Sequence, residues 1–491
     1  MTEPPTQPIP RERGLFCNRT LNMRAIRAVG YDMDYTLVQY KIAAWEAHAF
    51  AHVKERLLAL GFPVAHLEFD MSSIIRGLVI DTKLGNVVKA NRFGYVKRAF
   101  HGTKPLSFEA LRSTYARDIV DLSDKRWVFL NTLFSLSEAS MFSALVDLFD
   151  AGELSFVHGY DEVYQVTRKH TDLSHMEGTL KAEIIAHPDR FVDLDPDAAV
   201  ALLDQKAAGK ALMLITNSEW HFTNAMMSYA YERFLPKGMK WRELFDLVIV
   251  GAQKPNFFVN RPLAFEVASD DGLLRTTNGP LEKGKSYFGG NALLVEESLG
   301  ISGDDILYVG DHIWGDVNVT KQALRWRTAL VVHELEQEIV DQTRAAAQIA
   351  ELESGMQRKA ALEAEHAQHR LRLMHERANG ARADHAGVVE INVELARLRA
   401  EISKLDTDIA PLAKRMSELS NANWGPLMWA GNDKSHFARQ VERHADVYTS
   451  RVSNFAFATP FVYLRSQRGT LPHDTSPNPL PADETAMGLA R

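Results

Sequence analysis

Short apolar runs separated by amphipathic stretches are the main pattern between residues 20 and 335. Five of these runs have the length and composition of buried parallel strands: residues 26–31, 211–215, 246–250, 306–309 and 328–332. Helical periodicity lies between several of them, for example at 196–208 and 220–234. Strands that alternate with helices predict an α/β fold with a doubly wound, Rossmann-like parallel sheet.

A long insertion separates the first two predicted strands. The gap is about 180 residues, which is far more than one crossover helix requires. It contains a helical pattern at 44–60 that ends before Gly61, a hairpin-like stretch at 87–100, and further helical patterns at 137–150 and 158–185. We therefore expect residues 45–200 to form an inserted α+β cap domain. Residues 21–44 and 201–335 would form the core.

Residues 336–422 have a different composition, dominated by Ala, Glu, Arg, Leu and Gln. Apolar residues with spacings of three and four form a heptad seam: Ile391, Leu395, Leu398, Ile402, Leu405, Ile409, Leu412, Met416 and Leu419. Asn379-Gly380 predicts a turn from an earlier helix at about 335–377. This pattern predicts an antiparallel helical hairpin, and Pro411 predicts a kink or an early end of its second helix.

The two ends of the chain differ from the rest in composition. Residues 1–20 and 470–491 are rich in proline and polar residues and are predicted to be loose tails. Residues 423–469 are expected to pack on the core.

Composition and charge narrow the class of protein. The chain has 491 residues, of which 46% are hydrophobic and 24% charged, as in soluble proteins with more than one domain. Its net charge of -7 disfavours nucleic acid and anionic membranes as partners. Cys17 is the single cysteine, so an intrachain disulfide is excluded. Because the sequence shows neither a signal-peptide pattern nor a long apolar run, we expect a cytoplasmic protein.

Polar residues of a particular kind follow four of the five predicted strands. They are Asp32 and Asp34, the run Thr216-Asn217-Ser218, Lys254, and Asp311 with Asp316. In open parallel sheets, ligands bind outside the carboxyl ends of the strands. We therefore expect several carboxylates, one lysine and one hydroxyl to share a single crevice.

This set of residues suits the transfer of a phosphoryl group. Clustered aspartates repel one another unless a cation lies among them, and hard oxygen ligands suit Mg²⁺. The metal and Lys254 would offset the charge of a phosphate, so that Asp32 could attack phosphorus and form an acyl phosphate. Asp34 could protonate the leaving oxygen and later activate water.

Each of these segments has a simpler interpretation when it stands alone. Two aspartates after a strand are commonly a turn or a metal site, and Thr-Asn-Ser is commonly a helix N-cap. A Lys-Pro pair is most often a surface turn, and residues 310–316 could be a calcium loop. Their joint occurrence, in this order and each after an apolar run, favours the catalytic interpretation.

Several segments resemble one known family closely. DMDYTL (32–37), LITNSEW (214–220), KPNFF (254–258) and GDHIWGDV (310–317) are similar to motifs of the cytosolic purine 5′-nucleotidases in the haloacid dehalogenase superfamily. Residues 80–102, 129–134 and 425–451 resemble the same family. The resemblance covers most of residues 20–335 and 423–466, but not the predicted hairpin.

The resemblance implies roles for the residues of the crevice. Asp32 would be the nucleophile and Asp34 the acid and base, while Thr216, Asn217 and Lys254 would hold the phosphoryl group. The metal ligands of Mg²⁺ would be Asp32, the Asp34 carbonyl and Asp311, with Asp316 in support. The implied function is hydrolysis of IMP or GMP, with phosphate transfer to a nucleoside as a further activity.

The resemblance also implies a base-binding pocket and regulation. The matching substrate-binding positions are Asn131, Phe134, Arg168, Asp172, His175 and Lys181. Phe134 would stack on a purine, and Asp172 would accept hydrogen bonds from guanine or hypoxanthine. Family members are often nucleotide-regulated tetramers, which implies a homo-oligomer (dimer or tetramer). A nucleotide effector would bind near Asn131, Trp314, Gln440 and Arg443.

Two other functions remain open at this stage. The first is a phosphatase of the same superfamily that acts on a sugar phosphate or a cofactor phosphate. The second is an interaction protein in which the hairpin binds a partner and the sheet domain has no activity. The complete set of strand-end residues disfavours the second alternative.

Overall fold

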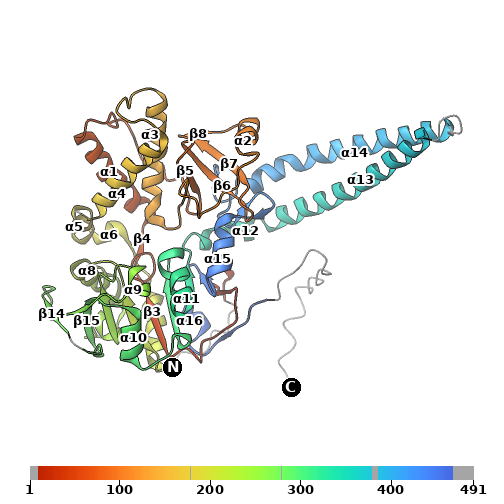
Figure 1. The fold of residues 1–491 in the computed structure, drawn as a ribbon. Coiled ribbons are helices and arrows are strands. Elements are labelled where there is room, and N and C mark those ends of the chain that lie inside the picture. The colour runs from red at the N-terminus through yellow and green to blue at the C-terminus, as the bar shows by residue number, and fades with distance from the viewer. Residues whose placement is uncertain (1–8, 177, 278, 379–384, 468–491) are drawn as a thin grey trace, which may run out of the picture.

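A mainly parallel sheet of ten strands forms the centre of the computed structural model, which describes residues 9–176, 178–277, 279–378 and 385–467 (Figure 1). The strand order is β1 (Phe16–Cys17), β20 (Val447–Thr449), β17 (Arg327–Val331), β16 (Ile306–Gly310), β3 (Ala28–Tyr31), β11 (Ala211–Ile215), β12 (Leu247–Val250), β15 (Lys285–Gly289), β13 (Ala264–Val267) and β14 (Leu274–Thr276). The seven strands from β20 to β15 are parallel, and β1, β13 and β14 pair antiparallel at the edges. This confirms the predicted α/β class.

Helices cover both faces of the sheet, which explains why its strands are continuous apolar runs. Val29 and Tyr31 of β3 pack in the core that includes α7 (Pro196–Ala207) and α8 (Trp220–Tyr231). Ala28 of the same strand packs in a second core with α9 (Asn256–Val259) and α10 (Ala292–Leu299). Successive residues of a strand point to opposite faces, so one short run supplies both cores.

The insertion begins and ends at a small two-stranded ladder between β4 (Gln39–Tyr40) and β10 (Val192–Asp193). Its helices are α1 (Ile42–Ala59), α2 (Phe108–Tyr115), α3 (Leu136–Asp150), α4 (Tyr160–Met176), α5 (Thr179–Ala186) and α6 (Pro188–Phe191). Its antiparallel sheet has the order β8 (Lys104–Pro105), β7 (Val96–His101), β6 (Asn86–Ala90), β5 (Val79–Asp81) and β9 (Trp127–Phe129). Helix α7 contacts β11 and α16 (Asn454–Ala458), so it belongs with the sheet and not with the predicted insert of 45–200.

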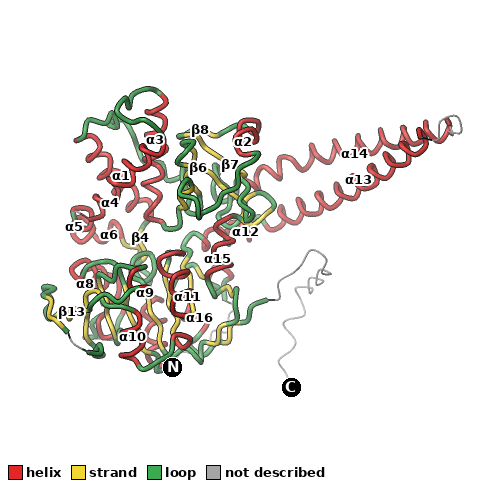
Figure 2. The backbone as a smooth tube through the Cα atoms, in the orientation of Figure 1, coloured by secondary structure: helices red, strands yellow, loops and turns green. Residues whose placement is uncertain are grey.

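The helical hairpin projects away from the rest of the molecule (Figures 1 and 2). Helix α12 (Leu335–Arg344) leads into α13 (Ala346–Ala378), which contacts α14 (His385–Ser417) along its length. Leu395, Leu398 and Leu412 of the predicted seam are buried. Of the two outcomes predicted for Pro411, a kink or an early end, the early end does not occur, because α14 continues past Pro411 to Ser417. The predicted turn at Asn379-Gly380 lies outside the described residues.

The segments at both ends of the chain pack on the sheet domain. Strand β2 (Leu21–Asn22) pairs with β21 (Tyr463–Leu464), and β1 pairs with β20. Residues 9–20 are therefore not the loose tail that the composition predicted, because the backbone of Phe16–Cys17 and the side chain of Arg13 find partners in residues 447–454. Between α14 and β20 lie β18 (Trp429–Ala430), β19 (Asp433–Lys434) and α15 (His436–His444). Within the described residues, no helix is long and apolar enough to cross a membrane.

Candidate active site

The predicted strand-end residues do meet at one edge of the sheet. Strands β12, β11, β3 and β16 are neighbours and run parallel, so their carboxyl ends lie side by side. Asp32 follows β3 and Asp311 follows β16, which brings their carboxylates together with that of Asp316. The nearest carboxylate oxygens of these three residues all lie within 4.8 Å of one another.

Lys254 lies between two of these carboxylates. Its Nζ is 2.8 Å from Oδ1 of Asp32 and 2.8 Å from Oδ1 of Asp316, and it also donates a hydrogen bond to the Tyr308 hydroxyl at 3.1 Å. The ammonium is nearly inaccessible, since only 4% of the side chain is exposed. Lys254 therefore holds the two aspartates in a fixed arrangement at the floor of the site.

Two glycines make this close arrangement sterically feasible. A Cβ at Gly30 would lie 2.8 Å from the ring of Tyr308, and one at Gly310 would lie 2.5 Å from Oδ2 of Asp316. Without these side chains, Tyr308 reaches across β3 to donate to the Ile215 carbonyl at 3.0 Å. Asp316 accepts a hydrogen bond from the His312 amide at 3.1 Å.

The site contains more negatively charged groups than positively charged ones. Burial raises the pKa of Asp32 to about 7, an effect that Lys254 opposes and that Asp316 and Asp34 reinforce. Burial, with the charges of Asp316 and Asp32, also raises the pKa of Asp311 well above its usual range. Burial lowers the pKa of Lys254, but Asp316 and Asp32 raise it by more, so the lysine stays charged. One ammonium cannot neutralise three buried carboxylates, so this donor set fits a divalent cation.

Asp34 is held at the mouth of the same site by two hydroxyl groups. Its Oδ1 accepts a hydrogen bond from the Tyr40 hydroxyl at 2.6 Å, and its Oδ2 accepts one from Ser218 Oγ at 2.7 Å. Ser218 in turn accepts a hydrogen bond from Lys181 Nζ at 3.2 Å. The carboxylate of Asp34 is thus oriented by residues from the sheet domain and from the insertion.

Thr216 and Asn217 have different roles in the structure. Asn217 fixes the loop that carries Lys254, because its side chain accepts from the Lys254 amide at 2.6 Å and donates to the Lys254 carbonyl at 3.1 Å. Thr216 is fully buried, and its Oγ1 accepts a hydrogen bond from the Ser218 amide at 3.1 Å. Thr216 therefore shapes the turn after β11.

A cavity of about 460 Å³ opens above these groups. Its walls include Asp32, Asp34, Asn217, Lys254, Asp311 and Asp316 from the sheet domain. Phe134, Asp172 and Lys181, three of the positions that the family resemblance implies for a base pocket, line it from the insertion. The cavity therefore joins the catalytic candidates to a part of the insertion that can contact the rest of a substrate.

Of the other predicted substrate-binding residues, Arg168 and Asn131 are absent from the described lining of the cavity. Arg168 pairs with Glu138 at 2.9 Å and with Asp172 at 3.1 Å, so its charge is balanced within the insertion. Asn131 directly precedes Thr132, which does line the cavity. His175 lies in α4, but its side chain is outside the described residues. The structure thus gathers only part of the predicted pocket.

The sequence did not single out several residues that complete the site. Tyr40 and Ser218 orient Asp34, Tyr308 contacts Lys254, and Thr132 donates to Asp311 Oδ2 at 3.3 Å. Ser218 lies in a run that was already quoted, so a search for the partners of Asp34 could have found it. Tyr40 lies only six residues after Asp34, so it could also have been considered as a local partner. Thr132 and Tyr308 depend on contacts between distant segments, which no local pattern reveals.

The predicted effector residues lie partly together. Trp314 lines the cavity and packs on His444, with ring centroids 5.2 Å apart. Gln440 forms side-chain hydrogen bonds with His436 and His444, and Arg443 belongs to the same helix α15. Trp314 therefore connects the candidate active site with α15.

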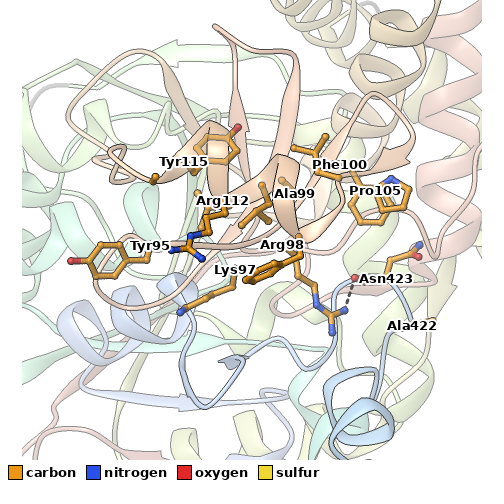
Figure 3. A pocket seen from close by; sticks show the side chains of 15 residues that line it. Tyr95, Lys97, Arg98, Ala99, Phe100, Pro105, Arg112, Tyr115, Ala422 and Asn423 are labelled. Atoms are coloured by element: carbon orange, nitrogen blue, oxygen red, sulfur yellow. Dashed lines mark hydrogen bonds between the residues drawn. The ribbon is translucent and has the colours of Figure 1, made fainter. Parts of the chain in front are cut away.

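A second cavity lies on the sheet of the insertion, against the chain that follows the hairpin (Figure 3). Aromatic and basic side chains line it, among them Tyr95, Lys97, Arg98, Phe100 and Arg112. Arg98 donates a hydrogen bond to the Asn423 carbonyl at 2.6 Å. Among its described lining residues there is no aspartate or glutamate, so this cavity lacks the groups for the chemistry expected at Asp32.

Fold and site together define an α/β protein with a carboxylate–lysine centre at the carboxyl edge of a parallel sheet. The model of the 5′ nucleotidase family matches residues 15–476, and the chain belongs to this family. The rat protein named 5′-nucleotidase domain-containing protein 2 is 31% identical over 345 residues, which cover 66% of this chain and 60% of the relative. The human protein of the same name is 30% identical over 345 residues, covering 66% of this chain and 64% of the relative. The chain thus spans less than two thirds of these curated relatives.

Proposed function

We propose that this protein is a Mg²⁺-dependent 5′-nucleotidase that hydrolyses purine nucleoside monophosphates, IMP or GMP, through an aspartyl phosphate on Asp32. Transfer of the phosphoryl group to a nucleoside hydroxyl is a second outcome of the same intermediate. The observation that carries the proposal is the contact of 2.8 Å between Lys254 and Asp32 at the floor of the cavity. Family membership, with its general dependence on a divalent metal, supports the same reaction class.

The side chains of the site can perform the reaction in two steps. In the first, a carboxylate oxygen of Asp32 forms a bond to phosphorus while the bond from phosphorus to the ester oxygen breaks. Asp34 gives its proton to the leaving oxygen, and the hydrogen bonds from Tyr40 and Ser218 keep it in position. In the second step, Asp34 accepts a proton from water or from a nucleoside hydroxyl, which attacks phosphorus and releases Asp32.

Lys254 and the metal have complementary parts in this proposal. Mg²⁺ would be held by the carboxylates of Asp32 and Asp311 and the Asp34 carbonyl, with Asp316 in support, and it supplies positive charge to the phosphoryl oxygens. The Lys254 ammonium lies between Asp32 and Asp316 and would stabilise the charge that develops during transfer. Asn217 keeps the Lys254 loop in place through hydrogen bonds to both the amide and the carbonyl of Lys254.

The insertion supports the choice of a nucleotide as substrate. Phe134 offers an aromatic face at the cavity wall, and Asp172 offers a carboxylate that can accept hydrogen bonds from the ring N–H of hypoxanthine or guanine. Lys181 Nζ lies 3.2 Å from Ser218 Oγ, which is one of the two hydroxyl groups that orient Asp34. We accordingly interpret the insertion as the cap of a haloacid dehalogenase-type fold, which selects the base.

A panel of phosphate esters tests the proposal. Release of inorganic phosphate with Mg²⁺ should show a higher kcat/KM for IMP and GMP than for CMP, UMP and ribose 5-phosphate. EDTA should abolish the release, Mg²⁺ should restore it, and Ca²⁺ should restore little because its coordination is looser. Equal kcat/KM for all esters would contradict the nucleotide pocket and favour another phosphate monoester. Full activity after exhaustive chelation would contradict the metal dependence.

A further inference from the structure

A second group of potential metal ligands lies in the insertion, away from the catalytic carboxylates. His48 and His52 are four residues apart on α1, which places both imidazoles on one face of the helix. Glu183 on α5 faces them, and the two helices are in contact. One ligand atom from each of the three residues lies within 4.8 Å of the others.

The distances in this cluster approach those of a tetrahedral zinc site. Zn²⁺ lies about 2.0–2.2 Å from histidine nitrogen and carboxylate oxygen, which gives a separation of about 3.4 Å between two ligands of a tetrahedron. Nε2 of His48 lies 3.2 Å from Oε2 of Glu183. The imidazoles of His48 and His52 have centroids 4.6 Å apart and nearly perpendicular planes. Because its ligand atom already lies within 4.8 Å of the other two, reorientation of the partly exposed His52 side chain would bring all three ligands to a common ion.

The donor atoms of His48 and Glu183 are positioned to bind a metal ion. His48 is only 9% exposed, and among the described residues its Nε2 makes no well-aligned hydrogen bond, only the 3.2 Å contact with Glu183 Oε2. Arg190 donates a hydrogen bond to Oε1 of Glu183 at 2.9 Å, which leaves Oε2 directed at His48. Such an outer hydrogen bond is the usual way in which a ligating carboxylate is oriented.

We propose that His48, His52 and Glu183 form a binding site for a transition-metal dication of the Zn²⁺ class, distinct from the Mg²⁺ site at Asp32. Two imidazoles and one carboxylate suit Zn²⁺ or Co²⁺ better than Mg²⁺, which prefers oxygen ligands. The bound ion ties α1 to α5. Because Lys181 lies two residues before Glu183 on α5, the ion also steadies the helix that presents Lys181 to the cavity.

One other cluster with a histidine occurs among the described residues and provides a matched control. Glu365, His369 and Glu394 lie on the two long helices of the hairpin. This cluster has a single imidazole, and both carboxylate oxygens of Glu394 already accept hydrogen bonds from Arg397. It is therefore a poorer match for Zn²⁺, and His369→Ala removes a histidine without affecting the proposed site.

Cobalt absorption and thermal unfolding test the proposal on the full-length protein. Co²⁺ is titrated in excess Mg²⁺, which occupies the all-oxygen site at Asp32. The unsubstituted protein and His369→Ala should bind one equivalent with the intense visible bands of four-coordinate Co²⁺, and Zn²⁺ should displace it and raise Tm. His52→Ala should lose these bands and the rise in Tm, with affinity for Zn²⁺ weaker by at least about 100-fold.

The outcomes decide the proposal without reference to nucleotidase activity. His48→Ala should behave like His52→Ala, and if it fails to fold, the partly exposed His52 alone decides. The proposal is wrong if Co²⁺ gives no four-coordinate spectrum in the unsubstituted protein. It is also wrong if His52→Ala retains the spectrum, or if His369→Ala is the variant that loses it.

Discussion

Lys254 is the residue on which the geometry of the candidate active site depends most. It contacts Asp32 and Asp316 at 2.8 Å each and is 4% exposed. Removal of one partner from a buried charge cluster is strongly destabilising, because the remaining charges are left uncompensated. Lys254 thus holds the aspartates together, and in the proposed mechanism it also stabilises the charge on the phosphoryl group.

Substitution of this lysine should affect the chemical step. We expect Lys254→Met to lower kcat for the best monophosphate by about 10²–10³-fold, the usual effect of losing one donor to a developing charge. The measurement is kcat at saturating Mg²⁺, with circular dichroism to verify folding. Lys283→Met is the control, because that ammonium is 66% exposed and 3.9 Å from its nearest carboxylate. A folded Lys254→Met variant with unchanged kcat would contradict the assigned role.

The sequence was sufficient to find the charged residues of the site but not the residues that orient them. Asp32, Lys254 and Asp311 each follow a recognisable strand, so the parallel sheet brings them together. Thr132 reaches Asp311 only because the insertion folds over the sheet edge, which brings together residues that are distant in sequence. Tyr40 is close to Asp34 in sequence, but no residue pattern marks it as the partner of that carboxylate. Arg168 shows the opposite case, since its predicted role competes with ion pairs to Glu138 and Asp172.

Among the individual elements, helix α1 carries a buried carboxyl group, that of Glu46, on its packed face. Glu46 of α1 is fully buried and accepts a hydrogen bond from the Ser137 amide at 2.8 Å. Burial raises the pKa of Glu46 from 4.5 to about 8. The folded protein therefore binds this proton more tightly than the unfolded chain does. Stability from this group is fully present below pH 4.5 and is lost as the pH rises toward 8.

This pKa shift predicts a pH-dependent effect of Glu46→Gln. The amide can still accept the hydrogen bond from Ser137 but carries no charge, so the variant should gain stability relative to the unsubstituted protein between about pH 5 and 8. The gain should be at most about 1.4 kcal/mol per pH unit in the free energy of unfolding, measured with urea. The exposed Glu68→Gln should show no such trend. A difference that stays constant with pH would disprove the assignment.

The helical hairpin is structurally separate from the candidate active site. Its long helices α13 and α14 pack mainly on each other, whereas Leu335 and Ile339 of α12 belong to the core beside β17. At the end of α14 and just beyond it, the carbonyls of Ser417 and Asn423 accept hydrogen bonds from Arg98. Any shortened form should therefore keep α12 and the chain from residue 417 onward.

Replacement of residues 346–416 with a short Gly/Ser linker should leave kcat within a few fold. The expectation follows because no hairpin residue lines the cavity among the residues that the structure describes. Light scattering on the same variant would show whether the hairpin sets the oligomeric state. A soluble, folded variant without phosphatase activity would mean that the hairpin completes the active site.

Predictability also differs between elements. The hairpin and the five central strands follow from long or strongly apolar patterns. Strand β20 has three residues, and β1 has two that pair with it from the other end of the chain. Such short strands are defined by their partner and not by their own composition, so the sequence indicated a loose tail where β1 lies.

At the scale of the whole molecule, the candidate site lies where the sheet domain and the insertion meet. Asp32 and Lys254 come from the sheet, and Phe134, Asp172 and Lys181 come from the insertion. In the proposed function, the sheet domain performs the chemistry and the insertion selects the substrate. The proposed His48–His52–Glu183 site would then stabilise the insertion.

Trapping of the phosphoenzyme is the most direct test of the proposed covalent intermediate on Asp32. The protein is mixed with IMP labelled with ³²P in its phosphate and quenched in acid within a turnover, and the labelled peptide is then identified. In the unsubstituted protein, we expect label on the peptide that contains Asp32. Asp34→Asn should form and lose this label more slowly, and Asp32→Asn should show neither label nor turnover. Near-normal phosphate release by Asp32→Asn, or turnover without any labelled peptide, would contradict the covalent mechanism.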